Sequence, residues 1–165
     1  MCIRDRHLTA KYGSTPEQQA QIRANISARG EEVGFKFNPE GRGRVYNTFN
    51  AHRLIHWAGV KGPAGSQHAL KRALLEAYQG RAERVESDEV LLSVVTSIGL
   101  DVTEAKEILA SDTYAQEVRE VEQFYQQAGI HSVPAVIIND KHLISGGQPA
   151  EVFEQALRKI AAGEV

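Results

Sequence analysis

The chain has 165 residues, of which 42% are hydrophobic and 24% are charged, which is typical of one ordinary globular domain. Its 19 Lys and Arg against 21 Asp and Glu give a formal net charge of -2, which excludes the strongly basic surface of a nucleic-acid-binding or anionic-membrane-binding protein. Its one cysteine, Cys2, excludes an internal disulfide, a thiolate metal cluster and a two-cysteine redox motif within these residues.

The N-terminal residues contain no recognisable targeting signal. Charged residues interrupt Met1 to Arg6, so the segment lacks the apolar centre of a secretory signal, and no stretch approaches the roughly 20 apolar residues that cross a bilayer. We therefore expect a cytoplasmic protein without a membrane span. The same six residues have no periodicity or cap and run directly into His7 to Tyr12, which reads like the end of a helix. We predict that residues 1–6 are a non-native leader.

The first predicted helix runs from Ser14 to about Gly34. Thr15 has the chemistry of an N-cap, Pro16 suits the first helical position, and Gln18 completes a capping box. The apolar residues are only loosely periodic, which indicates a peripheral helix.

A second helix is predicted from Asn47, as its N-cap, to about Gly59. It is largely apolar around His52 and Arg53. His52 and His56 share one face at i and i+4 spacing, but no third ligand is evident, so we predict no metal site.

Four more helices follow from apolar residues at helical spacing. They are expected from about Leu70 to Gly80, from Ser87 or Asp88 to Gly99, from Thr103 to about Leu109, and from Asp112 to Gly129.

The pattern then changes to that of a β-hairpin and a final helix. Val133 to Ile138 is a continuous apolar run, typical of a strand buried on both faces. Asn139 to Lys141 predicts a tight turn and His142 to Ser145 a second strand. Pro149 opens a last helix, which we expect to pack on the hairpin through Val152, Phe153 and Leu157.

An isolated two-stranded hairpin is marginal in water, and an apolar strand with an unpaired edge invites aggregation. No other segment of the chain is a convincing strand. We therefore expect the missing strands to come either from an oligomer or from sequence absent at the N-terminus.

Four segments carry a family resemblance: Lys11-Tyr12-Gly13, Tyr46-Asn47-Thr48-Phe49-Asn50-Ala51-His52-Arg53-Leu54, Gly129-Ile130-His131-Ser132-Val133-Pro134, and Ser145-Gly146-Gly147-Gln148-Pro149. Together, over about residues 7–162, they resemble the DsbA-like family of thioredoxin-fold thiol–disulfide oxidoreductases, which includes the FrnE proteins and the 2-hydroxychromene-2-carboxylate isomerases.

The resemblance implies an α/β, thioredoxin-like fold with a helical insertion, from which this chain lacks the N-terminal strand-helix-strand half and its Cys-x-x-Cys pair. Residues 7–128 would form the helical insertion region and residues 129–162 the C-terminal strand-strand-helix part, all within one domain. We therefore expect no catalytic residue in the chain as given.

The resemblance also implies three candidate substrate-binding positions. Val133-Pro134 would be the family's cis-proline loop, which offers its backbone to an extended substrate, although a trans proline at the start of a strand is the alternative. His52 and Arg53 would face the same groove and hold a substrate carboxylate or a thiolate, or else form a solvated helix face. Gly146-Gly147 would admit a peptide or glutathione, or serve only as a turn.

The activity implied is dithiol–disulfide exchange with a thiol- or disulfide-containing protein or glutathione, with no cofactor and no nucleic-acid or membrane partner. The oligomeric state stays open. Two alternatives also stay open: a glutathione-dependent isomerase or transferase of the same superfamily, and a non-catalytic helical binding module whose hairpin edge pairs with a partner.

Overall fold

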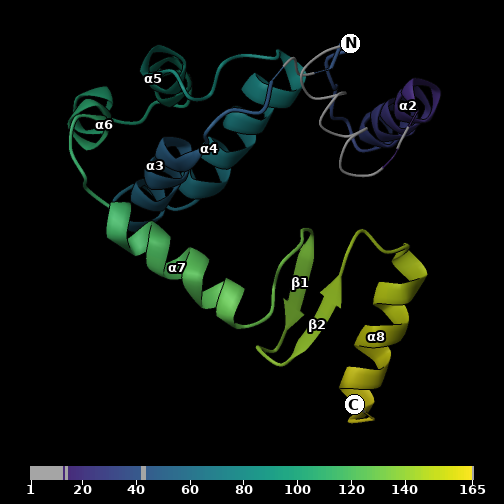
Figure 1. Ribbon diagram of the computed structural model, residues 1–165. Helices are drawn as coiled ribbons and strands as arrows, with labels where there is room; N and C mark the ends of the chain where they lie inside the picture. Colours follow the sequence, from purple (N-terminus) through teal and green to yellow (C-terminus); the bar gives the residue numbers. More distant parts are fainter. Residues whose placement is uncertain (1–12, 14, 42–43, 165) are drawn as a thin grey trace. The chain divides into compact units, whose positions relative to one another are not determined.

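The computed structural model describes residues 13, 15–41 and 44–164. The chain forms two compact units, and the boundary between them lies inside a helix. The first unit extends to Val118, and its described part is helical. The second begins at Arg119 and consists of the rest of that helix, a hairpin and a final helix (Figure 1).

The helices lie close to their predicted positions. They are α2 (Pro16–Glu32), α3 (Phe49–Val60), α4 (Ser66–Leu75) with a π-helical turn at Glu76–Gly80, α5 (Asp88–Ser97), α6 (Val102–Leu109) and α7 (Ala115–Gln127). In the part of the chain that the structure describes, no helix combines the length and apolar character needed to span a bilayer.

The predicted capping box of α2 is confirmed. The Thr15 hydroxyl accepts a hydrogen bond from the Gln18 amide at 3.3 Å, and the Gln18 side-chain oxygen accepts one from the Thr15 amide at 2.9 Å. Local side-chain chemistry is therefore sufficient to locate the start of this helix.

Two helices begin within one residue of the predicted start, with N-caps that differ from the prediction. Asn47 accepts from the Phe49 amide at 2.9 Å, but Thr48 occupies the N-cap of α3. The N-cap of α6 is Asp101, whose carboxylate accepts from the Thr103 and Glu104 amides at 2.8 and 3.1 Å. A carboxylate is stabilised at the N-terminal end of a helix, because it interacts with the helix dipole as well as with the free amides.

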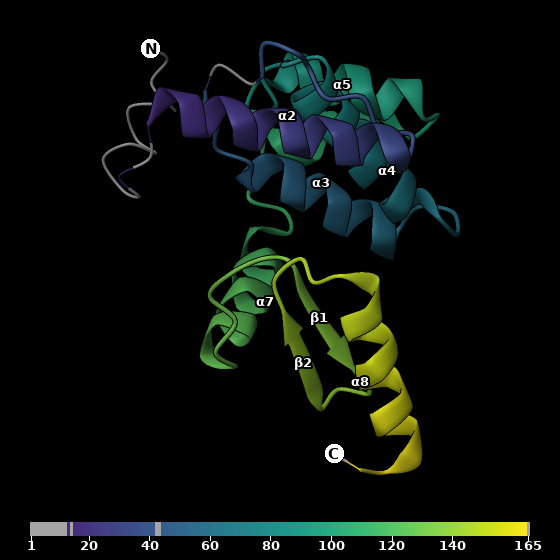
Figure 2. The same cartoon turned by 90° about the vertical axis from the view of Figure 1, so that its right-hand side faces the viewer.

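The core of the first unit is built by α3, α4, α5 and α6. In it α3 packs on α4 (Figure 2), and α5 packs on both α4 and α6. Its largest fully buried side chains are Leu54, Trp57, Leu70, Leu91 and Val95. Trp57 is the one tryptophan of the chain, so its fluorescence reports the unfolding of this unit.

Ala82, in the connection that follows the π-helical turn, has a φ of 57°, which favours glycine over residues with a Cβ. We expect Ala82→Gly to raise the free energy of unfolding of the first unit by up to about 1 kcal/mol. Urea unfolding followed by Trp57 fluorescence measures this. The matched control is Ala69→Gly within α4, which should lower it by about 1 kcal/mol. A loss of stability in Ala82→Gly would contradict the strain argument.

The second unit contains the predicted antiparallel hairpin of β1 (Ala135–Ile138) and β2 (His142–Ser145), with Ala135 opposite Ser145. Asn139 and Asp140 have φ values of 53° and 55°, which these two residue types tolerate well. The Lys141 amide donates to the Ile138 carbonyl at 3.2 Å and closes the turn. The position and register of the hairpin follow from this local chemistry.

The prediction that β1 is buried on both faces is wrong for this unit. Val136 and Ile137, which point to opposite faces of the sheet, are 38% and 41% exposed. Burial on both faces needs further elements on each side of a sheet, and the described residues of the unit supply only two strands and the flanking helices. The apolar residues of β1 are typical of a central strand, but β1 has only one neighbouring strand among the described residues.

The final helix, α8 (Ala150–Ala162), follows Pro149 and ends before Gly163, which has a φ of 70°. Phe153 is half-buried, as expected, whereas Val152 and Leu157 are 41% and 51% exposed. Of the three side chains predicted to pack on the hairpin, Phe153 is therefore the most buried, and Val152 and Leu157 keep much of their surface exposed.

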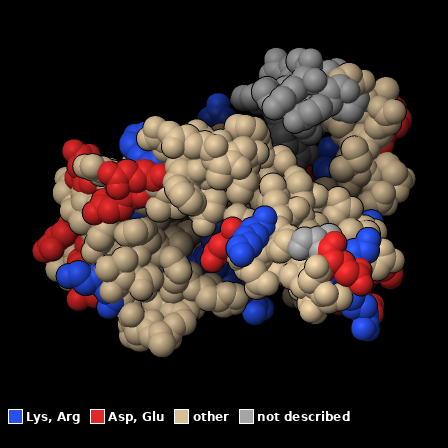
Figure 3. Space-filling model, turned by 90° about the horizontal axis from the view of Figure 1, so that it is seen from below, with Lys and Arg blue, Asp and Glu red and all other residues tan. Residues whose placement is uncertain are grey.

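Acidic and basic side chains are interspersed on the face that Figure 3 shows. This arrangement agrees with the nearly balanced charge of the chain. It offers no extended basic patch on that face.

Candidate functional site

Two of the predicted segments lie together at one end of the hairpin. The Gly146 amide donates to the Pro134 carbonyl at 2.8 Å, and a Cβ on Gly147 would lie 4.0 Å from the Pro134 Cγ atom. Gly146 has a φ of 82°, so it turns the chain where most other residues would be strained. Val133-Pro134 and Gly146-Gly147 therefore form one local surface.

The Val133–Pro134 peptide bond is cis, the geometry that the family resemblance led us to expect. The Val133 residue is 88% exposed. Within the described residues its main-chain amide and carbonyl form no hydrogen bond. This loop thus presents free backbone groups at the surface of the unit.

The register of the hairpin shows which other backbone groups are free. Hydrogen-bonded and non-hydrogen-bonded pairs alternate along an antiparallel ladder. Because Pro134 and Gly146 form a hydrogen-bonded pair, the amides and carbonyls of Ala135 and Ile137 point away from β2. The sheet has two strands, so this edge of β1 has no strand partner among the described residues.

The opposite edge of the hairpin is partly covered. Ser145 directs its carbonyl away from β1, and the Gln148 side-chain amide donates to it at 2.9 Å. A side chain that satisfies an outer carbonyl leaves less of that edge for another strand. The open edge of the sheet is therefore the β1 edge, beside the Val133-Pro134 loop.

Arg53 has a structural role in the first unit. It is 4% exposed, and its guanidinium donates to the Thr113 carbonyl at 2.9 Å and to the Asn50 side-chain oxygen at 3.0 Å. It also donates to the carbonyls of Ile108 and Ser111. These carbonyls lie at and beyond the C-terminal end of α6, where the helix dipole favours a cation. The arginine thus fixes the loop that follows α6.

The two histidines of α3 have different surroundings. His56 is half-buried, and its ring centroid lies 5.2 Å from that of Tyr114. His52 is exposed. His52 and Arg53 belong to the first unit and Val133-Pro134 to the second, so their predicted proximity stays a prediction.

A family model described as the DSBA-like thioredoxin domain matches residues 4–158. Among solved structures, the chain is similar to a probable DsbA oxidoreductase from Streptomyces coelicolor, with 36% identity and a TM-score of 0.82, over 96% of this chain and 66% of that one. It is also similar to a protein described as a protein disulfide isomerase from Nitrosomonas europaea, with 23% identity and a TM-score of 0.68, over 92% and 78%. No match to a curated protein is found.

The helices, the small sheet and these similarities define a thioredoxin-like α/β protein, as the sequence predicted. The chain belongs to the DSBA-like thioredoxin domain family, a family of thiol–disulfide oxidoreductases. It spans 66% of the length of the Streptomyces protein.

Proposed function

We propose that the protein exchanges dithiols and disulfides and that this chain supplies the surface on which an extended substrate docks. The observation that supports this most directly is the free backbone of Val133, Ala135 and Ile137 beside Gly146-Gly147, in a chain of the DSBA-like family. The proposed substrates are thiol- or disulfide-containing proteins, with glutathione as a smaller alternative.

Docking follows from the chemistry of a sheet edge. An extended peptide pairs with every second residue of an open strand, and the outward amides and carbonyls of β1 occur at that spacing. The absence of a side chain at Gly147 leaves room for a second backbone near Pro134. Main-chain hydrogen bonds of this kind do not depend on the side chains of the peptide, so one surface can bind many sequences. This suits an enzyme that acts on many proteins.

The exchange itself needs two thiols. In the first step a cysteine thiolate of the protein attacks one substrate sulfur, the substrate S–S bond breaks, and a mixed disulfide forms. The second cysteine then displaces the substrate thiolate, so two electrons pass from the protein dithiol to the substrate disulfide. We propose that sequence outside these 165 residues supplies this pair, since Cys2 is the one cysteine of the chain and lies outside the described residues.

The chain as given should therefore show no dithiol oxidase or disulfide isomerase activity, because one cysteine can neither form the internal disulfide that accepts electrons from a reduced substrate nor resolve a mixed disulfide. The assay is the refolding of a reduced multi-disulfide protein, with Cys2→Ala as the matched variant. Catalysis above the uncatalysed rate that survives Cys2→Ala would contradict the proposal.

Docking is testable separately on the same chain by amide NMR. The probe is an extended apolar peptide whose cysteine is blocked as the S-methyl thioether, so that it binds without reacting. We expect saturable shifts at Val133, Ala135 and Ile137, with smaller changes at Leu143 on the opposite edge.

The control peptide has the same side chains but carries N-methyl groups on alternate residues, which removes the amides needed for strand pairing. It should not shift the β1 resonances. Equal shifts with both peptides, or shifts centred on Leu143, would show that the β1 edge is not the docking surface.

The genomic sequence upstream of His7 distinguishes the alternative within the superfamily. Two cysteines in the missing motif would support dithiol exchange, whereas a serine in the first position would favour a glutathione-dependent isomerase or transferase. Membership of the FrnE-like group and a cytoplasmic location remain predictions from the sequence alone.

A further inference from the structure

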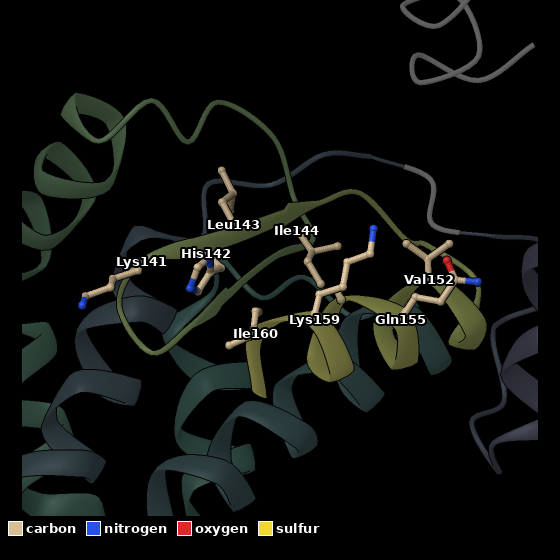
Figure 4. Close-up of a pocket in the computed structure, with 9 residues that line it drawn as sticks. Lys141, His142, Leu143, Ile144, Val152, Gln155, Lys159 and Ile160 are labelled. Atoms are coloured by element: carbon tan, nitrogen blue, oxygen red, sulfur yellow. The ribbon is translucent and has the colours of Figure 1, made fainter. Parts of the chain in front are cut away.

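The open groove between β2 and α8 in the second unit does not identify a ligand. Its lining includes Ile144 of β2 and Val152 and Ile160 of α8. Figure 4 shows the ammonium groups of Lys141 and Lys159 at opposite ends of the groove, with that of Lys141 directed away from the lining. The lining therefore has no cationic end that would select an acidic ligand.

In the first unit, α2 and the residues that follow it form an arm, residues 15–41, outside the helical core. Among the described residues, the buried core cluster has no member from this arm. Ile22 and Ile26 of α2 are 54% and 47% exposed, and the buried residues of this helix are Gln19 and Gly30. A segment with few buried apolar contacts has a low local stability.

The arm is held together by contacts within itself. The Phe35 amide donates to the Gly30 carbonyl at 2.7 Å, and the rings of Phe35 and Phe37 meet edge to face, with their centroids 4.7 Å apart. A Cβ on Gly30 would lie 2.7 Å from the Phe35 carbonyl oxygen and from the Phe37 ring, so glycine allows this close approach. The end of α2 and the residues after it are therefore one packed piece.

The arm contacts the core at the π-helical turn Glu76–Gly80. The Asn38 amide donates to the Gln79 carbonyl at 2.9 Å, and a Cβ on Gly80 would lie 3.2 Å from the Lys36 carbonyl oxygen. The backbone of the arm therefore lies directly against this turn. Such turns are rare in helices and are frequent at functional sites.

The same turn also contacts the chain just after the arm, through Tyr78. The Tyr78 hydroxyl donates to the Arg44 carbonyl at 2.9 Å, and the ring centroids of Tyr46 and Tyr78 lie 5.7 Å apart. Tyr78 is 8% exposed, and a hydrogen bond is stronger where water is largely excluded. One turn of the core thus contacts the chain on both sides of the arm's C-terminal end.

We propose that residues 15–41 open from the core as one unit, and that the Tyr78 hydroxyl makes the hydrogen bond that keeps them closed. Opening breaks the contacts of Asn38 and Arg44 with the π-helical turn and uncovers that turn. An isolated helix of 17 residues is marginal in water, so α2 unfolds once the arm has left the core. Amides of α2 and of Asn38 therefore share one opening equilibrium, separate from the unfolding of the core. The proposal does not rest on dithiol exchange.

Native-state hydrogen exchange of the full chain, followed by NMR at increasing urea below the unfolding transition, tests this opening. We expect the protection of Ile26, in the middle of α2, and of Asn38 to be about tenfold or more below that of the core helices α3 and α4. Urea should accelerate exchange of the core amides steeply and of the arm amides only slightly, because opening of the arm exposes little surface. Equal protection and equal urea dependence in arm and core would overturn the proposal.

Two variants separate the arm from the core. Val95→Ala removes two methyl groups from a fully buried core residue, so it should accelerate exchange in α3 and α4 and leave Ile26 and Asn38 unchanged, since the core stays folded when the arm opens. Tyr78→Phe keeps the ring and removes one hydrogen bond, so it should accelerate exchange of Ile26 and Asn38 about fivefold.

The matched control is Tyr125→Phe on α7, which removes the same atom from a residue that is 43% exposed in the second unit. It should leave exchange in the arm unchanged. Arm exchange that is unchanged in Tyr78→Phe, or that rises as much in Tyr125→Phe, would show that the Tyr78 hydroxyl does not keep the arm closed. Arm exchange that rises with core exchange in Val95→Ala would show that the two unfold together.

Discussion

Arg53→Ala should lower the free energy of unfolding of the first unit by about 3 kcal/mol or more. The side chain is 4% exposed and donates to three carbonyls and one side-chain oxygen. Hydrogen bonds from a charged donor contribute about 1.5–3 kcal/mol each, and their loss leaves buried carbonyls without a donor. Arg53→Lys should recover less than half of this loss, because one ammonium group cannot reach the same set of oxygens.

Trp57 fluorescence during urea unfolding measures the effect in the unit that contains Arg53. The control is Arg72→Ala on α4, where an exposed arginine pairs with Glu76 at 3.1 Å. Exposed pairs of this kind contribute about 0–1 kcal/mol. If Arg53→Ala were as mild as Arg72→Ala, the structural role of Arg53 would be wrong and its predicted role in substrate binding would regain support.

The parts of the fold that the sequence predicts best are set by contacts between near neighbours. The capping box of α2 joins Thr15 to Gln18, and the hairpin turn joins Ile138 to Lys141. In both cases the residue types that make the contact also define the motif. The positions of these elements could therefore be predicted without tertiary information.

The role of Arg53 could not be predicted in the same way. Its partners at Ile108, Ser111 and Thr113 are 55 to 60 residues away in sequence. Carbonyl acceptors are present in every residue, so no side-chain pattern marks them. The one available signal is that Arg53 adjoins Leu54 in a largely apolar helix, which is compatible with burial as well as with a binding face.

The candidate site was predictable in part. The sequence identified Val133-Pro134 and Gly146-Gly147 separately, and the hairpin brings them together because its register places Pro134 opposite Gly146. Which backbone groups are free depends on whether that pair is hydrogen-bonded, and residue types do not determine this. Only the structure therefore shows that the β1 edge is open and that the Gln148 side chain donates to the Ser145 carbonyl on the opposite edge.

Leu70→Ala should lower the stability of the first unit by about 2–5 kcal/mol, because Leu70 is fully buried where α4 packs in the core. The same helix offers a matched control in Leu75, which is 41% exposed, so Leu75→Ala should cost about 1 kcal/mol or less. Both variants change the same atoms in the same helix, and differ mainly in whether a cavity is left behind. Urea unfolding followed at Trp57 compares them directly, and equal losses would mean that α4 does not pack as the structure shows.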